Sequence, residues 1–170
     1  HYKDNPWVLG YDLLNEPVGV VPNYFSLADL YDRIYKKIRA VDPKHLIIME
    51  GVWYTNPTTK QETVDWDTLP YPQTRNWKNI MYQFHFYHWD YVDANGNRQK
   101  ADENFDSHKA FIDQKIAKAQ TAQSLYNVPT MIGEFYGFGI KSIWDYYVQK
   151  FNAQQWSWTS WSYKYHDSPS

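Results

Sequence analysis

Two glutamates stand where apolar segments of this sequence end. Glu16 lies in the run YDLLNEP, where a short hydrophobic stretch is followed directly by an amide, a carboxylate and a proline, and Glu134 lies in the run TMIGEF. Two carboxyl groups that face each other can cleave a glycosidic bond, because one protonates the leaving oxygen while the other acts as nucleophile or base. The sequence therefore predicts this chemistry if the fold brings the two segments together.

The chain alternates between segments typical of buried strands and segments typical of amphipathic helices. Five apolar runs have the length and composition of strands, and they cover residues 7–14, 45–50, 79–87, 130–135 and 156–161. Three segments repeat apolar residues at helical spacing, and they cover residues 26–41, 106–126 and 141–152. Strands that alternate with helices predict an α/β fold, with a parallel sheet and helices outside it.

Three segments carry more local signals. Ser26 and Asp29 resemble a capping box, which predicts that the first helix begins at Ser26. Residues 51–79 contain no convincing helix, and so long a connection within a compact domain is usually functional. The polar stretch 93–104 favours an Asn-Gly turn over a calcium-binding loop, because its glycine stands at the wrong position and no glutamate closes it.

Polar and aromatic residues gather at the predicted C-terminal ends of the strands. These residues are Asn15, Glu16, Glu50, His85, Tyr87, Glu134 and Trp161. In α/β barrels the loops that follow the strands converge at this edge, and active sites are built there. A barrel needs eight strands and the sequence predicts five, so the chain is either an open sheet or part of a barrel.

Aromatic residues make up 19% of the sequence, which contains nine Trp and sixteen Tyr. Several of them fall in predicted loops, among them Trp53, Trp66, Trp89 and Tyr136. Aromatic rings on loops can stack on the faces of sugars while the sugar hydroxyls stay solvated. The alternative is that these rings pack beneath long loops as small hydrophobic clusters.

Composition excludes several other classes of function. The net charge is −2 and the isoelectric point is near 6.3, which gives no electrostatic footprint for nucleic acid. The sequence has no segment of about 20 apolar residues, the length of a membrane span. It also has no cysteine, which excludes disulfides and thiolate zinc sites. We expect neither a metal nor a cofactor.

Four motifs occur in one order along nearly the whole chain. YDLLNEP resembles the acid/base motif of glycoside hydrolase family 5, a family of retaining β-glycosidases with a (β/α)8 barrel. YQFHFY is similar to the His-x-Tyr strand of that family, MIGEFYGFG to its nucleophile strand, and WSWTSWSYK to its last-strand tryptophan segment. Each motif alone is short, but the ordered set resembles the family strongly.

The resemblance implies roles for particular residues. Glu16 corresponds to the general acid/base, Glu134 to the nucleophile, and Asn15 to a residue that hydrogen-bonds the 2-hydroxyl of the reacting sugar. Tyr87 would hold Glu134, and His85 would line the site beside the acid/base. The implied reaction is a double displacement with retention at the anomeric carbon.

Further residues would bind the sugar chain. Trp161 would form the platform beneath the reacting sugar, and Trp53, Trp89 and Tyr136 are candidates for neighbouring subsites. We interpret Glu50 as a structural carboxylate at the rim or a distal sugar contact. The first expected substrate is a β-1,4-glucan, which would make the protein an endoglucanase. Mannan, β-1,3-glucan, xyloglucan and a glycolipid headgroup remain open.

The resemblance also implies that residues 1–170 are the C-terminal portion of a single catalytic domain. The chain would supply about strands 4 to 8 of the barrel, and an N-terminal half in the same or another chain would supply strands 1 to 3. Secretion is expected because a polymeric substrate is too large to enter a cell. The alternatives are a carbohydrate-binding relative without catalysis and an incomplete half-barrel that needs its N-terminal half.

Overall fold

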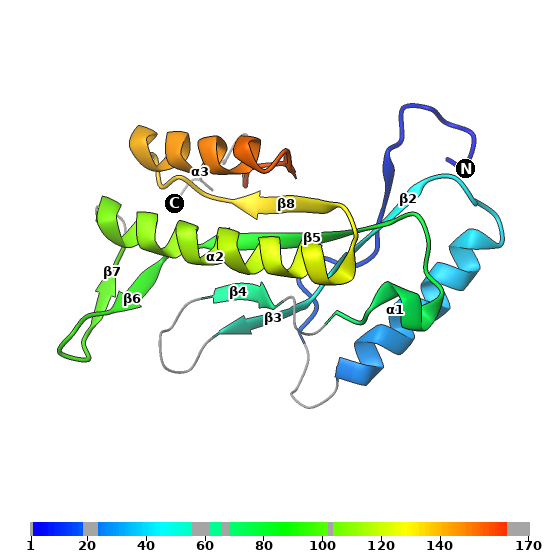
Figure 1. The fold of residues 1–170 in the computed structure, drawn as a ribbon, viewed down its shortest axis with the longest axis horizontal. Helices are drawn as coiled ribbons and strands as arrows, with labels where there is room; N and C mark the ends of the chain where they lie inside the picture. The colour runs from blue at the N-terminus through cyan, green and yellow to red at the C-terminus, as the bar shows by residue number, and fades with distance from the viewer. Residues whose placement is uncertain (1, 19–23, 56–61, 66–68, 102–103, 163–170) are drawn as a thin grey trace, which may run out of the picture.

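Five parallel strands form one curved sheet, in the spatial order β1, β2, β5, β8 and β9 (Figure 1). The computed structural model describes residues 2–18, 24–55, 62–65, 69–101 and 104–162. The parallel strands are β1 (Gly10–Asp12), β2 (Leu46–Glu50), β5 (Ile80–Tyr87), β8 (Thr130–Phe135) and β9 (Ser157–Trp158). They are the five predicted strands, although β1 and β9 are shorter than predicted.

Three helices connect these strands. They are α1 (Tyr24–Arg39), α2 (Phe105–Tyr126) and α3 (Lys141–Ala153). Figure 1 shows α2 and α3 lying together along β5 and β8, while α1 lies nearer β2. None of the described helices is long and apolar enough to cross a membrane.

The predicted N-terminus of the first helix is wrong. Ser26 lies within α1, two residues after Tyr24, so it cannot be the residue that caps the first turn. Asp29 instead pairs with the guanidinium of Arg75 at 2.7 Å, which ties α1 to the 3-10 helix η2 (Pro72–Arg75). Helix α2 does have an N-cap, because the side chain of Asn104 accepts a hydrogen bond from the Ser107 N–H at 2.9 Å.

Residues 51–79 contain more regular structure than the sequence predicts. Strands β3 (Val52–Thr55) and β4 (Glu62–Asp65) form an antiparallel hairpin, and β4 pairs with the C-terminal end of β5. A second hairpin, β6 (Asp90–Val92) and β7 (Arg98–Lys100), holds the predicted Asn-Gly turn, in which Gly96 has a φ of 84°. Both hairpins follow strands of the parallel sheet and extend the rim where the site is expected.

The side chains of β5 alternate between the two faces of the sheet. Tyr82, Phe84 and Phe86 belong to the hydrophobic core beneath α2 and α3. Phe135 of β8 is also fully buried there, with its ring 5.0 Å from that of Phe151. Burial of each such side chain contributes about 1.5–3 kcal/mol. The residues between them, including His85, face the interior of the curved sheet.

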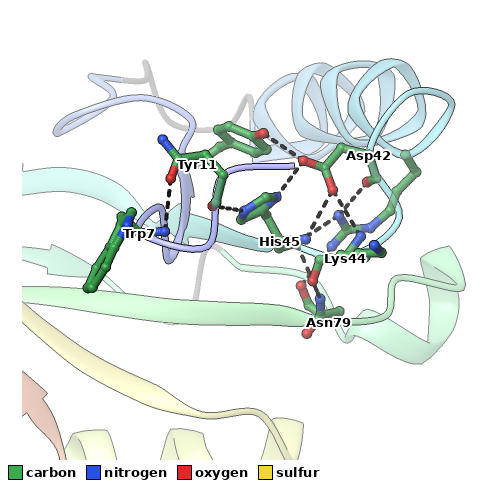
Figure 2. A network of polar contacts seen from close by, with 8 residues as sticks. Trp7, Tyr11, Asp42, Lys44, His45 and Asn79 are labelled. Carbon is green, nitrogen blue, oxygen red and sulfur yellow. Dashed lines mark hydrogen bonds and ion pairs between the residues drawn. The ribbon is translucent and has the colours of Figure 1, made fainter. Parts of the chain in front are cut away.

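A polar network fixes the opposite end of the sheet (Figure 2). The Asp42 carboxylate accepts hydrogen bonds from the Tyr11 hydroxyl at 2.6 Å, from the backbone N–H groups of Lys44 and His45, and from His45 Nδ1 at 2.6 Å. Burial opposes the charge on Asp42, but these donors outweigh burial and hold its pKa well below the usual range. The network joins β1, the end of α1 and the start of β2, so it sets the register of these elements away from the site.

Candidate active site

The C-terminal ends of the parallel strands surround a pocket of about 680 Å3. Its lining consists of Asn15, Glu16, Trp53, Tyr87, Trp89, Glu134, Tyr136, Trp161 and Ser162. The structure therefore brings together the site residues predicted from the sequence, except that His85 lies beneath the pocket and is 1% exposed. Trp66 lies outside the described residues.

One nitrogen of His85 lies close to both predicted catalytic carboxylates. Nδ1 of His85 lies 2.7 Å from Oε1 of Glu16 and 3.6 Å from Oε2 of Glu134. One carboxylate oxygen of Glu16 and one of Glu134 lie within 4.8 Å of each other and of this nitrogen. A small group bound between the two glutamates would therefore be in reach of both.

His85 is the cationic group at the centre of the site. Burial disfavours the imidazolium, but the carboxylates of Glu50, Glu16 and Glu134 outweigh that penalty and raise the pKa of His85 to about 9. The imidazole is therefore protonated at neutral pH and can donate hydrogen bonds from both nitrogens. Among the described residues, no lysine or arginine forms a salt bridge with these three carboxylates.

A β-bulge at Gly133 aims Glu134 into the site. In β8, Ile132 pairs with Phe84 and Glu134 pairs with His85, so Gly133 is an additional residue between the two pairs. In a regular strand without a bulge, the two-residue period would place Glu134 on the same face as the core residue Ile132. The bulge turns Glu134 inward and returns Phe135 to the core.

Only glycine fits at this bulge. A Cβ atom at position 133 would lie 2.1 Å from Gln83 Oε1 and 3.0 Å from His85 Nε2. Gln83 and His85 both hold carboxylates of the site, so neither can move away freely. A glycine inside a strand is a recognised signal of a bulge or of close packing, and that signal could have been read from the sequence.

Glu16 is held by its backbone as well as by its side chain. Its φ is 43°, in the left-handed region that residues with a side chain rarely adopt. Its N–H donates to Oε2 of Glu50 at 2.9 Å, and the next carbonyl, that of Pro17, accepts from the Trp53 N–H at 2.8 Å. These two contacts hold the strained turn after β1 and direct the Glu16 carboxylate toward His85.

Tyr87 holds the other glutamate. Its hydroxyl donates a hydrogen bond to Oε2 of Glu134. Burial, and then the adjacent Glu134 carboxylate, raise the pKa of the Tyr87 phenol, so the hydroxyl keeps its proton. The Tyr87 side chain is therefore a permanent donor to Glu134 at neutral pH.

Aromatic rings form the walls of the pocket. Trp89 stacks on Tyr87 at a centroid distance of 5.7 Å and lies 5.9 Å from the ring of Tyr136. Trp53 packs edge-on against Tyr87 at 6.3 Å. Trp161 is 58% exposed, with its N–H bonded to the Phe135 carbonyl at 3.0 Å. Trp89 and Trp161 thus present ring surface to the pocket, as sugar stacking requires.

Sequence reasoning undervalued Glu50. Of the two roles predicted for it, a structural carboxylate at the rim or a distal sugar contact, the second is wrong, because its side chain is completely buried and cannot touch a substrate in the pocket. Gln83, which donates to Oε1 of Glu50 at 2.5 Å, was missed altogether. An alternating pattern of polar residues in β5, with Gln83 and His85 between buried aromatics, was the available signal.

Comparison with known proteins identifies the family. The family model for cellulase, glycosyl hydrolase family 5, matches residues 1–167. The chain belongs to glycosyl hydrolase family 5. This confirms the resemblance inferred from the four sequence motifs.

Individual relatives are longer than this family 5 chain. A β-xylosidase from Phanerodontia chrysosporium is 26% identical over 121 residues, which are 66% of this chain and 23% of the relative. Cellulose synthase subunit Z from Clostridioides difficile has a TM-score of 0.66 at 18% identity, over 91% of this chain and 53% of that structure. Endoglucanase Cel5A from Pseudomonas stutzeri has a TM-score of 0.63 at 17% identity, over 95% of this chain and 48% of that structure.

These likenesses confirm the predicted fold. The parallel sheet and its helices correspond to about half of a family 5 (β/α)8 barrel. The chain spans about half the length of the two structures and less than a quarter of the β-xylosidase.

Proposed function

We propose that this protein is a glycoside hydrolase that cleaves β-glycosidic bonds with retention of configuration. The observation that carries the proposal is the closeness of Glu16 and Glu134, since one carboxylate oxygen of each lies within 4.8 Å of the other. Retaining glycosidases hold their carboxyl groups about 5–5.5 Å apart, whereas inverting enzymes leave about 6.5–9.5 Å for a water molecule. The short separation supports the retaining mechanism.

The reaction would proceed in two steps. In the first, Glu134 attacks the anomeric carbon, the glycosidic C–O bond breaks, and Glu16 gives its proton to the leaving oxygen. In the second, Glu16 takes a proton from water, whose oxygen attacks the anomeric carbon and releases Glu134. Tyr87 and His85 would orient the two carboxylates throughout, because each donates a hydrogen bond to one of them.

A β-glucan is the substrate class that we propose. Exposed tryptophan rings around an open pocket suit a chain of equatorial sugars, whose flat faces carry C–H groups. Asn15 lines the pocket beside Glu16 and would hydrogen-bond the 2-hydroxyl of the reacting sugar. The endoglucanase among the structural neighbours and the xylosidase among the relatives are consistent with a β-linked glycan. We further propose that the protein is secreted, since such polymers remain outside cells.

We also propose that residues 1–170 form the C-terminal portion of a single catalytic barrel. In the described part of the chain, β1 pairs only with β2. The adjoining apolar side chains of Trp7 and Leu9 are 93% and 63% exposed. A barrel half that supplied strands 1 to 3 would cover this edge, and the roughly half-length match to the neighbouring structures supports its existence.

The stereochemistry of the product tests the proposal. The full-length protein that contains this chain is mixed with cellopentaose, and the anomeric proton signals are followed by NMR before mutarotation occurs. The β-anomer should appear first, and Glu134→Gln should abolish it. The α-anomer appearing first would contradict the retaining mechanism. Binding of cellopentaose without any hydrolysis would favour the alternative of a carbohydrate-binding protein.

A further inference from the structure

We propose that Glu50 is a positioning residue of this active site, which fixes the backbone of Glu16 with one carboxylate oxygen and keeps His85 a two-sided hydrogen-bond donor with the other. The inference rests on the proposed function of Glu16 and Glu134. Glu50 is 0% exposed and does not line the pocket, so it acts only through its neighbours.

The first contact of Glu50 controls the turn that carries Glu16. Oε2 of Glu50 accepts the Glu16 N–H at 2.9 Å, at a residue whose φ is 43°. A left-handed conformation at a residue with a side chain is strained and persists only when surrounding contacts hold it. A charged acceptor for this N–H is such a contact, because hydrogen bonds to ionised groups are the stronger ones.

The second oxygen of Glu50 faces two donors. Oε1 accepts from Gln83 Nε2 at 2.5 Å and lies 3.3 Å from His85 Nε2. The amide of Gln83 also donates to Oδ2 of Asp12 at 2.5 Å, which leaves its Nε2 fully used. Gln83 therefore orients the Glu50 carboxylate from one side while His85 meets it from the other.

The charge of Glu50 decides where the protons of His85 lie. The carboxylates of Glu16, Glu50 and Glu134 face His85 directly, and the carboxylate of Asp12, beyond Gln83, also interacts with it electrostatically. A neutral imidazole has one N–H, so a proton on Nε2 toward Glu50 would leave Nδ1 without one toward Glu16. Only the imidazolium donates on both sides. A buried carboxylate opposite Nε2 stabilises that form, whereas an amide of the same size would not.

The fold gives a physical reason to assign Glu50 a role. A carboxylate withdrawn completely from water is costly, and a glutamine could fill the same space at lower cost. Glu50 ends β2 directly opposite Gln83, and its carboxylate oxygens reach the Glu16 N–H, the Gln83 amide and His85. Because the Glu50 carboxylate contacts Glu16, Gln83 and His85 together, its negative charge would orient all three.

Glu50→Gln tests the proposal in the full-length protein. The variant keeps an oxygen for the Glu16 N–H and loses the charge. In the wild type, 15N NMR of the His85 imidazole should show both nitrogens protonated at pH 7. In the variant, the midpoint of this titration should fall by at least one pH unit, and kcat on cellopentaose should fall at least tenfold while KM changes less than threefold.

Controls separate this role from a purely structural one. Asp113→Asn, which alters a carboxylate between Tyr146 and Lys150 away from the site, should leave the His85 titration and kcat unchanged. Glu50→Asp, which restores the charge, should recover a high His85 midpoint. An unchanged His85 titration in Glu50→Gln would overturn the proposal. The NMR measurement does not require catalytic turnover. If the proposed hydrolysis is wrong, the wild type will be inactive, and the His85 titration will still test the role of Glu50.

Discussion

The Tyr87 hydroxyl donates a hydrogen bond to the Glu134 carboxylate from the next strand of the sheet. Because this phenol keeps its proton, the contact fixes one oxygen of Glu134 and leaves the other free to react. In the proposed mechanism the nucleophile must lose its negative charge as it attacks, so the donor must orient Glu134 without moving it away from the sugar.

Tyr87→Phe should lower kcat about 10- to 100-fold, because hydrogen bonds to charged groups contribute about 1.5–3 kcal/mol and 1.36 kcal/mol corresponds to a factor of ten. KM should change little, because the hydroxyl holds the nucleophile more than the substrate. Steady-state kinetics on cellopentaose would measure both constants. Tyr146→Phe is the matched control, since that hydroxyl binds Asp113 on the outer helices. Equal losses in both variants would count against the proposed role of Tyr87.

Glu16→Gln should lose activity in a way that depends on the leaving group. Hydrolysis of cellopentaose should fall about 100- to 10,000-fold, because general acid–base catalysis contributes about 10²–10⁴-fold to the step that limits turnover. The first step on 2,4-dinitrophenyl β-cellobioside should be nearly unaffected, since that leaving group needs no proton. Rescue of turnover by azide, with β-glycosyl azide as the product, would confirm the acid/base role. A uniform loss on both substrates without rescue would contradict it.

Gly133→Ala should destabilise the protein and inactivate it together. The added Cβ would meet Gln83 Oε1 at 2.1 Å, and overpacking of this kind costs about 1–3 kcal/mol in the free energy of unfolding. The displacement would reach His85, and through it both glutamates. Gly96→Ala is the control: it is strained by its φ of 84° but has open space around it, so it should cost stability without loss of kcat. Urea unfolding and kinetics on both variants measure the two effects.

The Asp42–His45 pair should make stability depend on pH. The hydrogen bond to Asp42 raises the pKa of His45 above its ordinary value of 6.5, so the folded state binds the proton more tightly than the unfolded state. This contribution is fully present below pH 6.5 and is lost as the pH rises through the folded pKa. His45→Gln should abolish that part of the decline in unfolding free energy on the alkaline side. Urea titrations at pH 6, 7.5 and 9 would detect it, and an identical decline in both proteins would exclude the pair as its source.

The order of strands and helices could be predicted because each strand of the sheet is an apolar run bounded by polar residues. The family could be predicted because four short motifs occur in one order. The hairpin of β3 and β4 was missed, since its stability comes from pairing with β5, which is distant in sequence. The capping box was misassigned at Ser26, because a Ser-x-x-Asp pattern reads the same inside a helix as at its start.

Within the site, the glutamates were predictable from motif and position, but their supports were not. The bulge at Gly133 depends on which residue of β5 pairs with each residue of β8. The burial of Glu50 depends on three strands that meet beneath the pocket. Both features depend on the packing of strands far apart in the chain. The glycine in TMIGEF and the polar residues in YQFHFY signal them, but local sequence patterns do not give their geometry.

The most direct test of the central claim is covalent labelling of the nucleophile. The full-length protein is incubated with 2,4-dinitrophenyl 2-deoxy-2-fluoro-β-cellobioside, and its intact mass and peptide masses are measured. The proposed mechanism predicts one added fluorocellobiosyl group per molecule, attached to Glu134, and none in Glu134→Gln. A label on any other carboxylate would contradict the assignment of Glu134 as the nucleophile. The absence of any label on an enzyme that still hydrolyses cellopentaose would contradict it as well.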